Sequence, residues 1–187
     1  MVVARETFKN DQSFVDVTNA YWLDESSVNL GMTRLYGRAI SDERINDYVP
    51  DVRFGRTSFI GALGIEGIIA PMTFKGTLNQ SVFSKYIEEI LTPAMNEGDV
   101  LFMDNCSVHK VKDILNPLLE KGVHVIFLPT YSPNFNPIEN AFSKIKACLR
   151  KLKARTLPEL FDAIQIALKS ITRQDISGWI KHCGYSL

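Results

Sequence analysis

The sequence has few cysteines and no apolar run long enough to cross a membrane. Three cysteines stand far apart along 187 residues, at Cys106, Cys148 and Cys183. A scattered, odd-numbered set forms neither a disulfide framework nor a zinc cluster, so we expect reduced thiols. No window approaches the roughly 20 apolar residues of a spanning helix, and the N-terminus becomes charged too early for a secretory signal. We expect an intracellular protein without a membrane partner, in the cytoplasm or nucleoid if bacterial and in the nucleus if eukaryotic.

The chain also lacks a net charge, since 21 basic residues balance 21 acidic ones. That balance alone argues weakly against a nucleic-acid partner. The charges are nevertheless separated along the sequence, because every charged residue from 144 to 155 is basic. These residues are Lys144, Lys146, Arg150, Lys151, Lys153 and Arg155. They form either a solvated helix face or a face that contacts the DNA backbone while the whole molecule stays neutral.

The apolar pattern predicts short alternating elements in one globular domain. We predict strands at 20–24, 33–40, 57–63, 68–74, 99–104 and 124–128, and helices at 80–91, 111–119, 138–152 and 156–171. A hairpin signal at 64–67 joins the third and fourth of these strands.

The order of these elements predicts a fold class. Although four predicted strand segments precede the first helix, we interpret the order as three strands, a helix, a strand, a helix, a strand and then further helices. An antiparallel meander followed by alternating helices and parallel strands predicts an α/β mixed sheet flanked by helices, which is the ribonuclease H-like architecture. We assign residues 1–17 to an N-terminal extension, 18–155 to the ribonuclease H-like domain, and 156–187 to a C-terminal helical part packed on the same domain.

Two predicted strands end in an aspartate. Asp24 closes the first strand, and Asp104 closes the strand after the first helix. If these strands are parallel neighbours, the two carboxylates lie together at the sheet edge where ligands bind, and they repel unless a cation separates them. Oxygen ligands select Mg²⁺ or Mn²⁺, and a third carboxylate would complete a two-metal site for phosphoryl transfer. Glu139 is one of several candidates for it, and an aspartate at a strand end is also a common turn residue.

Three segments resemble the catalytic blocks of a known family. Residues 128–140, Leu-Pro-Thr-Tyr-Ser-Pro-Asn-Phe-Asn-Pro-Ile-Glu-Asn, closely resemble the segment around the last catalytic acid of mariner-type transposases and their bacterial insertion-sequence relatives. Residues 101–110 are similar to the block of the second aspartate, and residues 22–26 to that of the first. Residues 105 to 138, 34 in number, separate Asp104 from Glu139, which is the hallmark spacing of this family.

The resemblance covers residues 18 to 155 and implies the catalytic domain of a DDE transposase of the bacterial insertion-sequence branch. It implies that Asp24, Asp104 and Glu139 hold two divalent ions, Mg²⁺ or Mn²⁺, for hydrolysis at transposon ends and 3′-hydroxyl strand transfer into target DNA. The implied partners are both DNAs, a second copy of the chain on DNA, and a separate N-terminal helix-turn-helix region or protein. The alternatives are another ribonuclease H-like nuclease and a non-catalytic DNA-binding or interaction module derived from a transposase.

Several further residues have two interpretations each. Asn105 could orient the scissile phosphate or cap the local turn. His109 could also orient the scissile phosphate, or it could be a partly exposed loop histidine. Asn140, beside the last acid, is a candidate accessory residue. Trp179 and Tyr185 either pack the C-terminal tail down or contact a partner.

The start of the helix that carries Glu139 has its own alternatives. Asn136 is a good N-cap, and Pro137 is a good first helical residue. Glu139 would then be the third helical residue, either a metal ligand or only the partner of Asn136 in a capping box. Glu25, next to Asp24, is expected to face the opposite side of the sheet.

Overall fold

The computed structural model describes residues 2–34, 36–40, 43–46, 48, 50, 56–106, 109 and 112–187. The strands are β1 (Ala20–Val28), β2 (Thr57–Gly64), β3 (Gly67–Lys75), β4 (Val100–Met103) and β5 (His124–Phe127). The helices are α1 (Val2–Asp11), α2 (Gln80–Tyr86), α3 (Thr92–Ala94), α4 (Lys112–Glu120), α5 (Ile138–Leu152), α6 (Leu157–Lys169) and α7 (Arg173–His182). Short helical segments are η1 (Gln12–Phe14), η2 (Val17–Asn19), η3 (Ile87–Leu91) and η4 (Pro133–Phe135). Within this described part, no helix has the length and apolar character needed to span a bilayer.

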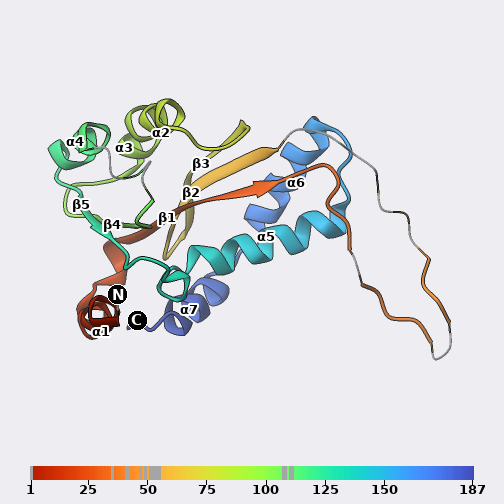
Figure 1. The fold of residues 1–187 in the computed structure, drawn as a ribbon, viewed down its shortest axis with the longest axis horizontal. Helices are drawn as coiled ribbons and strands as arrows, with labels where there is room; N and C mark the ends of the chain where they lie inside the picture. The colour runs from red at the N-terminus through yellow and green to blue at the C-terminus, as the bar shows by residue number, and fades with distance from the viewer. Residues whose placement is uncertain are drawn as a thin grey trace.

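The five strands form one mixed sheet in the order β3-β2-β1-β4-β5 (Figure 1). The first three strands are an antiparallel meander. β4 then pairs in parallel with β1, and β5 pairs in parallel with β4. The predicted sheet, with three antiparallel strands followed by parallel strands that alternate with helices, is therefore confirmed.

The predicted strand at residues 33–40 is wrong. Its described residues, which exclude Leu35, belong to no strand, and the second strand of the sheet is instead β2. Apolar side chains suggested a strand, but Tyr36 and Ile40 are 90% and 79% exposed. The described residues of this segment lie away from the sheet (Figure 1), so no neighbouring strand is there to bury one of its faces.

Helices cover both faces of the sheet, and the two faces belong to separate hydrophobic clusters. α5, α6 and α7 cover one face, where they pack on Trp22 and Phe102. α2, η3 and α4 cover the other face, where they pack on Leu23 and Met103. Because side chains alternate along a strand, position 24 faces the same side as Trp22, toward α5.

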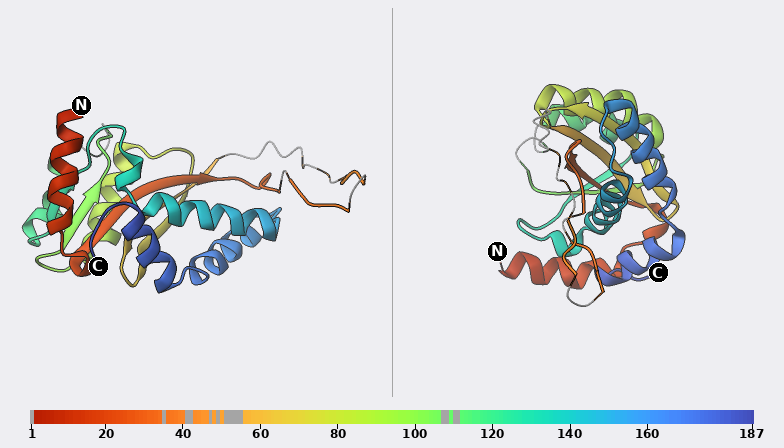
Figure 2. Two further views of the ribbon diagram at one scale, coloured as in Figure 1. Left: turned by 90° about the horizontal axis from the view of Figure 1, so that it is seen from below. Right: turned by 90° about the vertical axis from the view of Figure 1, so that its right-hand side faces the viewer.

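The two ends of the chain pack beside one another against the centre of the sheet. α1 and α7 lie at the same end of the molecule (Figure 2). Phe8 of α1 contacts Phe102 and Phe135, with ring centroids 6.2 and 5.1 Å apart. Tyr185 is buried, its ring lies 4.9 Å from that of Trp22, and its hydroxyl donates a hydrogen bond of 2.8 Å to the Phe135 carbonyl. Tyr185 therefore packs the tail down, as one of its two interpretations predicted.

Replacing Tyr185 with phenylalanine should destabilise the fold by about 1–2 kcal/mol, because the Phe135 carbonyl loses its buried donor. Urea unfolding should show a lower midpoint with an unchanged slope. Tyr36→Phe, which removes a hydroxyl from a ring that is 90% exposed, is the matched control and should unfold like the wild type. Equal stability of the Tyr185→Phe protein and the control would contradict the role given to this hydrogen bond.

Candidate active site

The parallel pairing of β1 with β4 brings the first two predicted acids together. Leu23 pairs with Met103 in this ladder, so residues 24 and 104 follow at the same level. The prediction that Asp24 closes its strand is wrong, because β1 continues to Val28 along its antiparallel partner β2, whereas Asp104 does follow the last residue of β4. Trp22 and Phe102 stack on the face toward α5, with ring centroids 5.6 Å apart. The alternation of strand side chains therefore directs Asp24 toward that face, and Asp104 emerges at the carboxyl end of β4.

Glu139 comes from the first turn of α5, which packs on β1. The N-cap of this helix is Pro137, and no side chain caps it. The predicted N-cap role of Asn136 and the capping-box interpretation of Glu139 are therefore wrong. The Asn136 amide instead donates a hydrogen bond of 3.3 Å to Asp24 Oδ2. A contact across the fold thus engages the amide nitrogen of Asn136 in place of a local cap.

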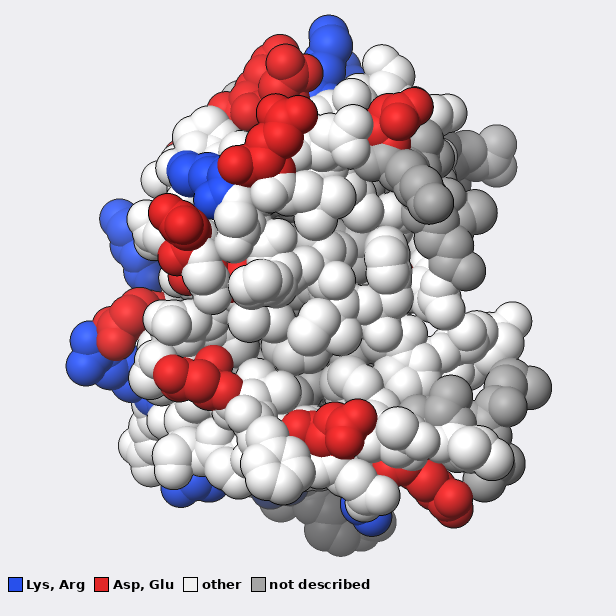
Figure 3. Space-filling view, turned by 90° about the vertical axis from the view of Figure 1, so that its left-hand side faces the viewer, with Lys and Arg blue, Asp and Glu red and all other residues white. Residues whose placement is uncertain are grey.

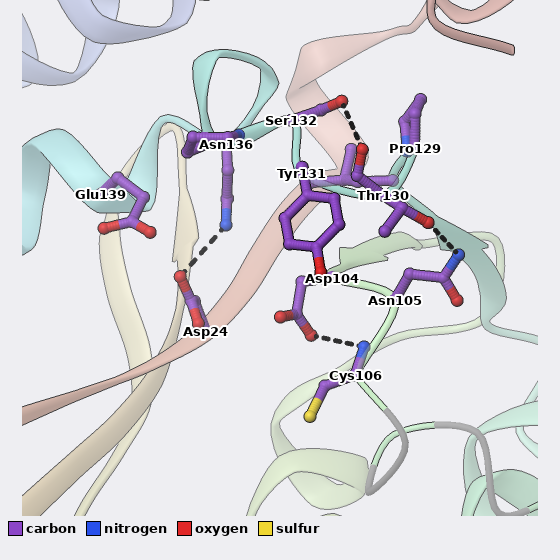
Figure 4. A pocket seen from close by; sticks show the side chains of 12 residues that line it. Asp24, Asp104, Asn105, Cys106, Pro129, Thr130, Tyr131, Ser132, Asn136 and Glu139 are labelled. Atoms are coloured by element: carbon purple, nitrogen blue, oxygen red, sulfur yellow. Dashed lines mark hydrogen bonds between the residues drawn. The ribbon is translucent and has the colours of Figure 1, made fainter. Parts of the chain in front are cut away.

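The three predicted acids line one pocket of about 370 Å³. Its other lining residues are Asn105, Cys106, Leu128, Pro129, Thr130, Tyr131, Ser132, Pro133 and Asn136. Asp24 and Glu139 lie near each other on one side, with Asp104 on another side of the same space (Figure 4). Sequence reasoning thus identified three side chains from separate elements that the fold gathers around one cavity.

The Asp24 carboxyl group lies in an unfavourable electrostatic environment. Burial raises its pKa to about 8, and the negative charges of Glu139 and Asp104 act in the same direction. The Glu25 amide, which donates to Asp24 Oδ1 at 2.7 Å, opposes the shift. Without a cation, this site therefore favours a proton on Asp24 at neutral pH.

Asp104 has the opposite environment. Desolvation raises its pKa, but the hydrogen bond and charge of His109 and the amide of Cys106 outweigh this effect, so the pKa lies below its usual value. His109 Nδ1 lies 2.6 Å from Asp104 Oδ1. The histidine is 3% exposed and its ring packs on Phe83, with centroids 4.6 Å apart. The predicted alternative of a partly exposed loop histidine is wrong.

The donor set of the pocket fits a hard divalent cation. In the part of the chain that the structure describes, no three His, Cys, Asp or Glu side chains are already close enough to form a metal site. Asp24 and Glu139 nevertheless bring two carboxyl groups close together. No basic side chain is among the groups that shift the pKa of Asp24. Asn136 also has a buried Oδ1 without a hydrogen-bond partner. Oxygen atoms in such an arrangement suit Mg²⁺ or Mn²⁺.

The accessory candidates separate into two groups. Asn105 lines the pocket and donates a hydrogen bond of 3.2 Å to Thr130 Oγ1. The local turn is closed by Asp104 itself, whose Oδ1 accepts from the Cys106 amide. Asn140 does not line the pocket, and its amide points to the Cys183 sulfur at 3.8 Å. Of the three accessory candidates, Asn105 lines the pocket and His109 contacts Asp104, whereas Asn140 does neither.

The basic stretch is divided between structural contacts and an open helix face. Lys144 pairs with Asp175, and Arg155 donates to the carbonyls of Leu30 and Met32. Of the other predicted backbone contacts, Lys146, Arg150 and Lys151 lie on α5, and Lys153 is the residue that ends this helix. At the opposite end of the molecule, formed by α4, β5 and α1, acidic side chains gather on the surface (Figure 3). α5 runs away from this acidic end (Figure 1).

Sequence reasoning missed Arg5. This residue of α1 donates to the Tyr131 carbonyl at 2.7 Å, to Ser132 Oγ at 3.0 Å and to Asn134 Oδ1 at 2.9 Å. Its guanidinium also lies over the Phe135 ring, 5.5 Å from the centroid. The contacts span more than 120 residues of sequence, so no local pattern signals them. Arg5 fixes the loop between β5 and α5 that forms the rim of the pocket.

The fold and the pocket first define a class: a ribonuclease H-like domain with acids gathered at the carboxyl edge of its parallel strands. The chain belongs to the DDE superfamily endonuclease family, whose model matches residues 19–161. The transposase of the transposable element Tcb1 from Caenorhabditis briggsae is 24% identical over 163 residues, which cover 82% of this chain and 60% of that protein.

Solved structures share the fold. The catalytic domain of Mos1 mariner transposase superposes with a TM-score of 0.65 at 11% identity, covering 98% of this chain and 87% of that one. The Mos1 mariner paired end complex with Mn gives a TM-score of 0.77 at 12% identity, covering 97% and 57%. The chain thus spans a little over half of that transposase and about 60% of the Tcb1 protein. These relatives do not support the predicted placement in the bacterial insertion-sequence branch.

The raised pKa of Asp24 predicts a pH-dependent stability. The native state keeps a proton that the unfolded chain releases above the ordinary value of 3.8, so this group lowers the free energy of unfolding as the pH rises from about 4 to about 8. Asp24→Asn should flatten that decline and, near pH 8 without divalent ions, stabilise the protein by on the order of 1–3 kcal/mol.

Urea unfolding at several pH values measures this effect. Asp162→Asn, which changes an exposed acid of α6, is the control and should follow the wild-type curve. A difference between Asp24→Asn and wild type that does not change with pH would show that burial and the neighbouring acids do not act on Asp24 as described.

Proposed function

We propose that this chain is the catalytic domain of a cut-and-paste DNA transposase. Asp24, Asp104 and Glu139 would hold two divalent ions, Mg²⁺ or Mn²⁺, for phosphodiester hydrolysis at transposon ends and strand transfer of the freed 3′-hydroxyl into target DNA. The observation that carries this proposal is the convergence on one pocket of three acids that belong to three separate elements and also have the family's spacing. The names of the relatives, a transposase and a strand transfer complex, support the same reaction.

The metal requirement has support from the relatives as well. Mos1 paired end complexes have been solved with Mn and with Mg. When bound, a pair of such ions supplies positive charge at the reacting phosphate and lowers the pKa of an attacking water. The pocket's acids would be the ligands, because they are the carboxylate oxygen donors that line it.

The chain's own residues would hold this site in place. The Asn136 amide orients the Asp24 carboxylate through Oδ2, and His109 orients that of Asp104 through Oδ1. A positioned carboxylate needs less reorganisation when the reacting phosphate arrives, and such preorganisation is a major part of phosphoryl-transfer catalysis. Asn105, which lines the same pocket, offers an amide for a phosphate oxygen.

The face of α5 supplies a path for the DNA backbone. Glu139, Lys146 and Arg150 are separated by seven and four residues, so they share one face of the helix. Lys144 and Lys151 fall on another face. The path leads from the pocket away from the acidic end of the molecule (Figure 1). As partners we propose transposon-end and target DNA, with a second copy of the chain on the DNA and a separate helix-turn-helix region reading the ends.

Plasmid nicking tests the proposed activity. Supercoiled plasmid incubated with the protein and Mn²⁺ or Mg²⁺ should be nicked, and EDTA should stop the reaction. Loss of a residue that only orients a metal ligand typically lowers metal affinity or activity about 10–100-fold. Asp104 would be a ligand itself, so Asp104→Asn should lower the nicking rate by more than about 100-fold. Asp162→Asn is the matched control and should retain the wild-type rate. No nicking by the wild type, together with no metal binding by calorimetry, would favour the non-catalytic alternative.

The DNA path predicts which basic residues matter. Replacing Lys146 and Arg150 together with glutamine should weaken binding to a duplex of any sequence and lower the slope of log affinity against log salt by about 2, since each phosphate contact contributes about 0.9. Lys151→Gln, on the other face of α5, should leave the slope unchanged. An equal loss in both proteins, measured by fluorescence anisotropy, would mean that no single face of α5 tracks the backbone.

A further inference from the structure

Tyr131 presents an aromatic ring to solvent at the pocket of the three acids. Tyr131 is 84% exposed, and it lines the same cavity as Asp24, Asp104 and Glu139. In Figure 4 the ring stands over the pocket between the side of Asn136 and the side of Asn105. A large ring that the fold leaves in water at a candidate active site is available to contact a ligand.

The backbone at Tyr131 is strained. Its φ is +56°, in the left-handed region that bulky residues with a β-carbon rarely adopt. Such a conformation persists only where the surroundings enforce it, and it is found preferentially at ligand clamps and active sites. Since the ring itself gains little burial, the strain is not offset by packing of this side chain.

Arg5 donates hydrogen bonds to the carbonyl of this strained residue and to two side chains that follow it. Its Nη1 donates both to the Tyr131 carbonyl and to Ser132 Oγ, and its Nη2 donates to Asn134 Oδ1. The planar guanidinium also covers the Phe135 ring. One forked side chain thus fixes three polar groups of the loop in a geometry that a lysine ammonium cannot reproduce.

We propose that Tyr131 is the stacking surface for an unpaired nucleobase beside the phosphate that reacts in this pocket, and that Arg5 holds the ring in place. The proposal rests on the proposed function, which brings a DNA phosphate to the three acids. Every nucleobase has a π-face, and stacking on one aromatic side chain strengthens binding by about 5- to 150-fold irrespective of sequence.

The surroundings of the ring favour a nucleobase over an acidic or an apolar ligand. The pocket carries three carboxyl groups, which disfavour a free anion next to the ring. Asn105, Ser132 and Asn136 line the same space, and their polar groups can meet the edge of a base. A base at this position would lie in the same pocket as a phosphate at the acids, so its contact would position the strand as well as bind it.

A forked DNA that carries 2-aminopurine as its unpaired junction base tests the proposal, because stacking quenches this fluorophore. Binding is measured in Ca²⁺ for the forked DNA and for the fully paired duplex. Wild type and Tyr131→Phe should quench the probe and prefer the forked DNA. Tyr131→Gly should lose the quenching and about 5- to 150-fold of the affinity for the forked DNA, with little change for the paired duplex.

The glycine variant separates stacking from folding. Glycine favours a positive φ, so Tyr131→Gly should unfold at the same urea concentration as wild type or a higher one. Phe14→Ala removes an aromatic ring that is 88% exposed outside the pocket, and it should leave quenching and affinity unchanged. Arg5→Lys should reduce the quenching and the preference for forked DNA while Tyr131 itself is present.

Full quenching by Tyr131→Gly, or none by the wild type, would overturn the proposal. The plasmid-nicking assay is run beside it. Nicking by the wild type without quenching would leave the proposed function in place and reject the stacking role. Quenching that depends on Tyr131, without nicking, would support the stacking role and reject the catalytic function.

Discussion

The parallel pairing of β1 with β4 is the constraint on which the site depends. Residues 20–23 pair with 100–103, and the stacked rings of Trp22 and Phe102 occupy one level of this ladder. A slip of one residue would turn these buried rings to the other face of the sheet. The hydrophobic core therefore fixes the register, and the register in turn sets Asp24 and Asp104 at the same level of the sheet. The position of two charged groups is decided by the packing of uncharged ones.

The same arrangement makes the pocket unfavourable for the empty protein. Asp24 is buried near Glu139, and a proton relieves the repulsion, as the raised pKa records. Asp104 keeps its charge because His109 lies against it. A proton on Asp24 and the imidazole of His109 beside Asp104 thus offset negative charge in the pocket. A bound divalent cation would offset the same charge. Groups placed for a reaction rather than for stability commonly show such opposed shifts of pKa.

Local patterns in the sequence predicted the parts of the structure that are local. Apolar runs gave β1 and β4, although β1 continues past Asp24 to Val28, and a family resemblance selected Glu139. The wrongly predicted strand at 33–40 has the apolar residues of a strand but no neighbouring strand to pair with. Sequence periodicity does not show whether such a neighbour is present. The N-cap prediction for Asn136 failed because its amide has a partner 112 residues away. The Arg5 contacts span 126 or more residues and were invisible for the same reason.

These distant contacts all meet at the loop between β5 and α5. Arg5 holds it from α1, the Tyr185 hydroxyl holds the Phe135 carbonyl from the C-terminal tail, and Asn136 ties its end to Asp24. A loop on a surface is ordinarily among the more mobile parts of a protein. Here both ends of the chain restrain it, and a restrained rim loses less conformational entropy when a ligand binds. The terminal segments therefore belong to the site physically, even though the acids that define it come from β1, the end of β4 and α5.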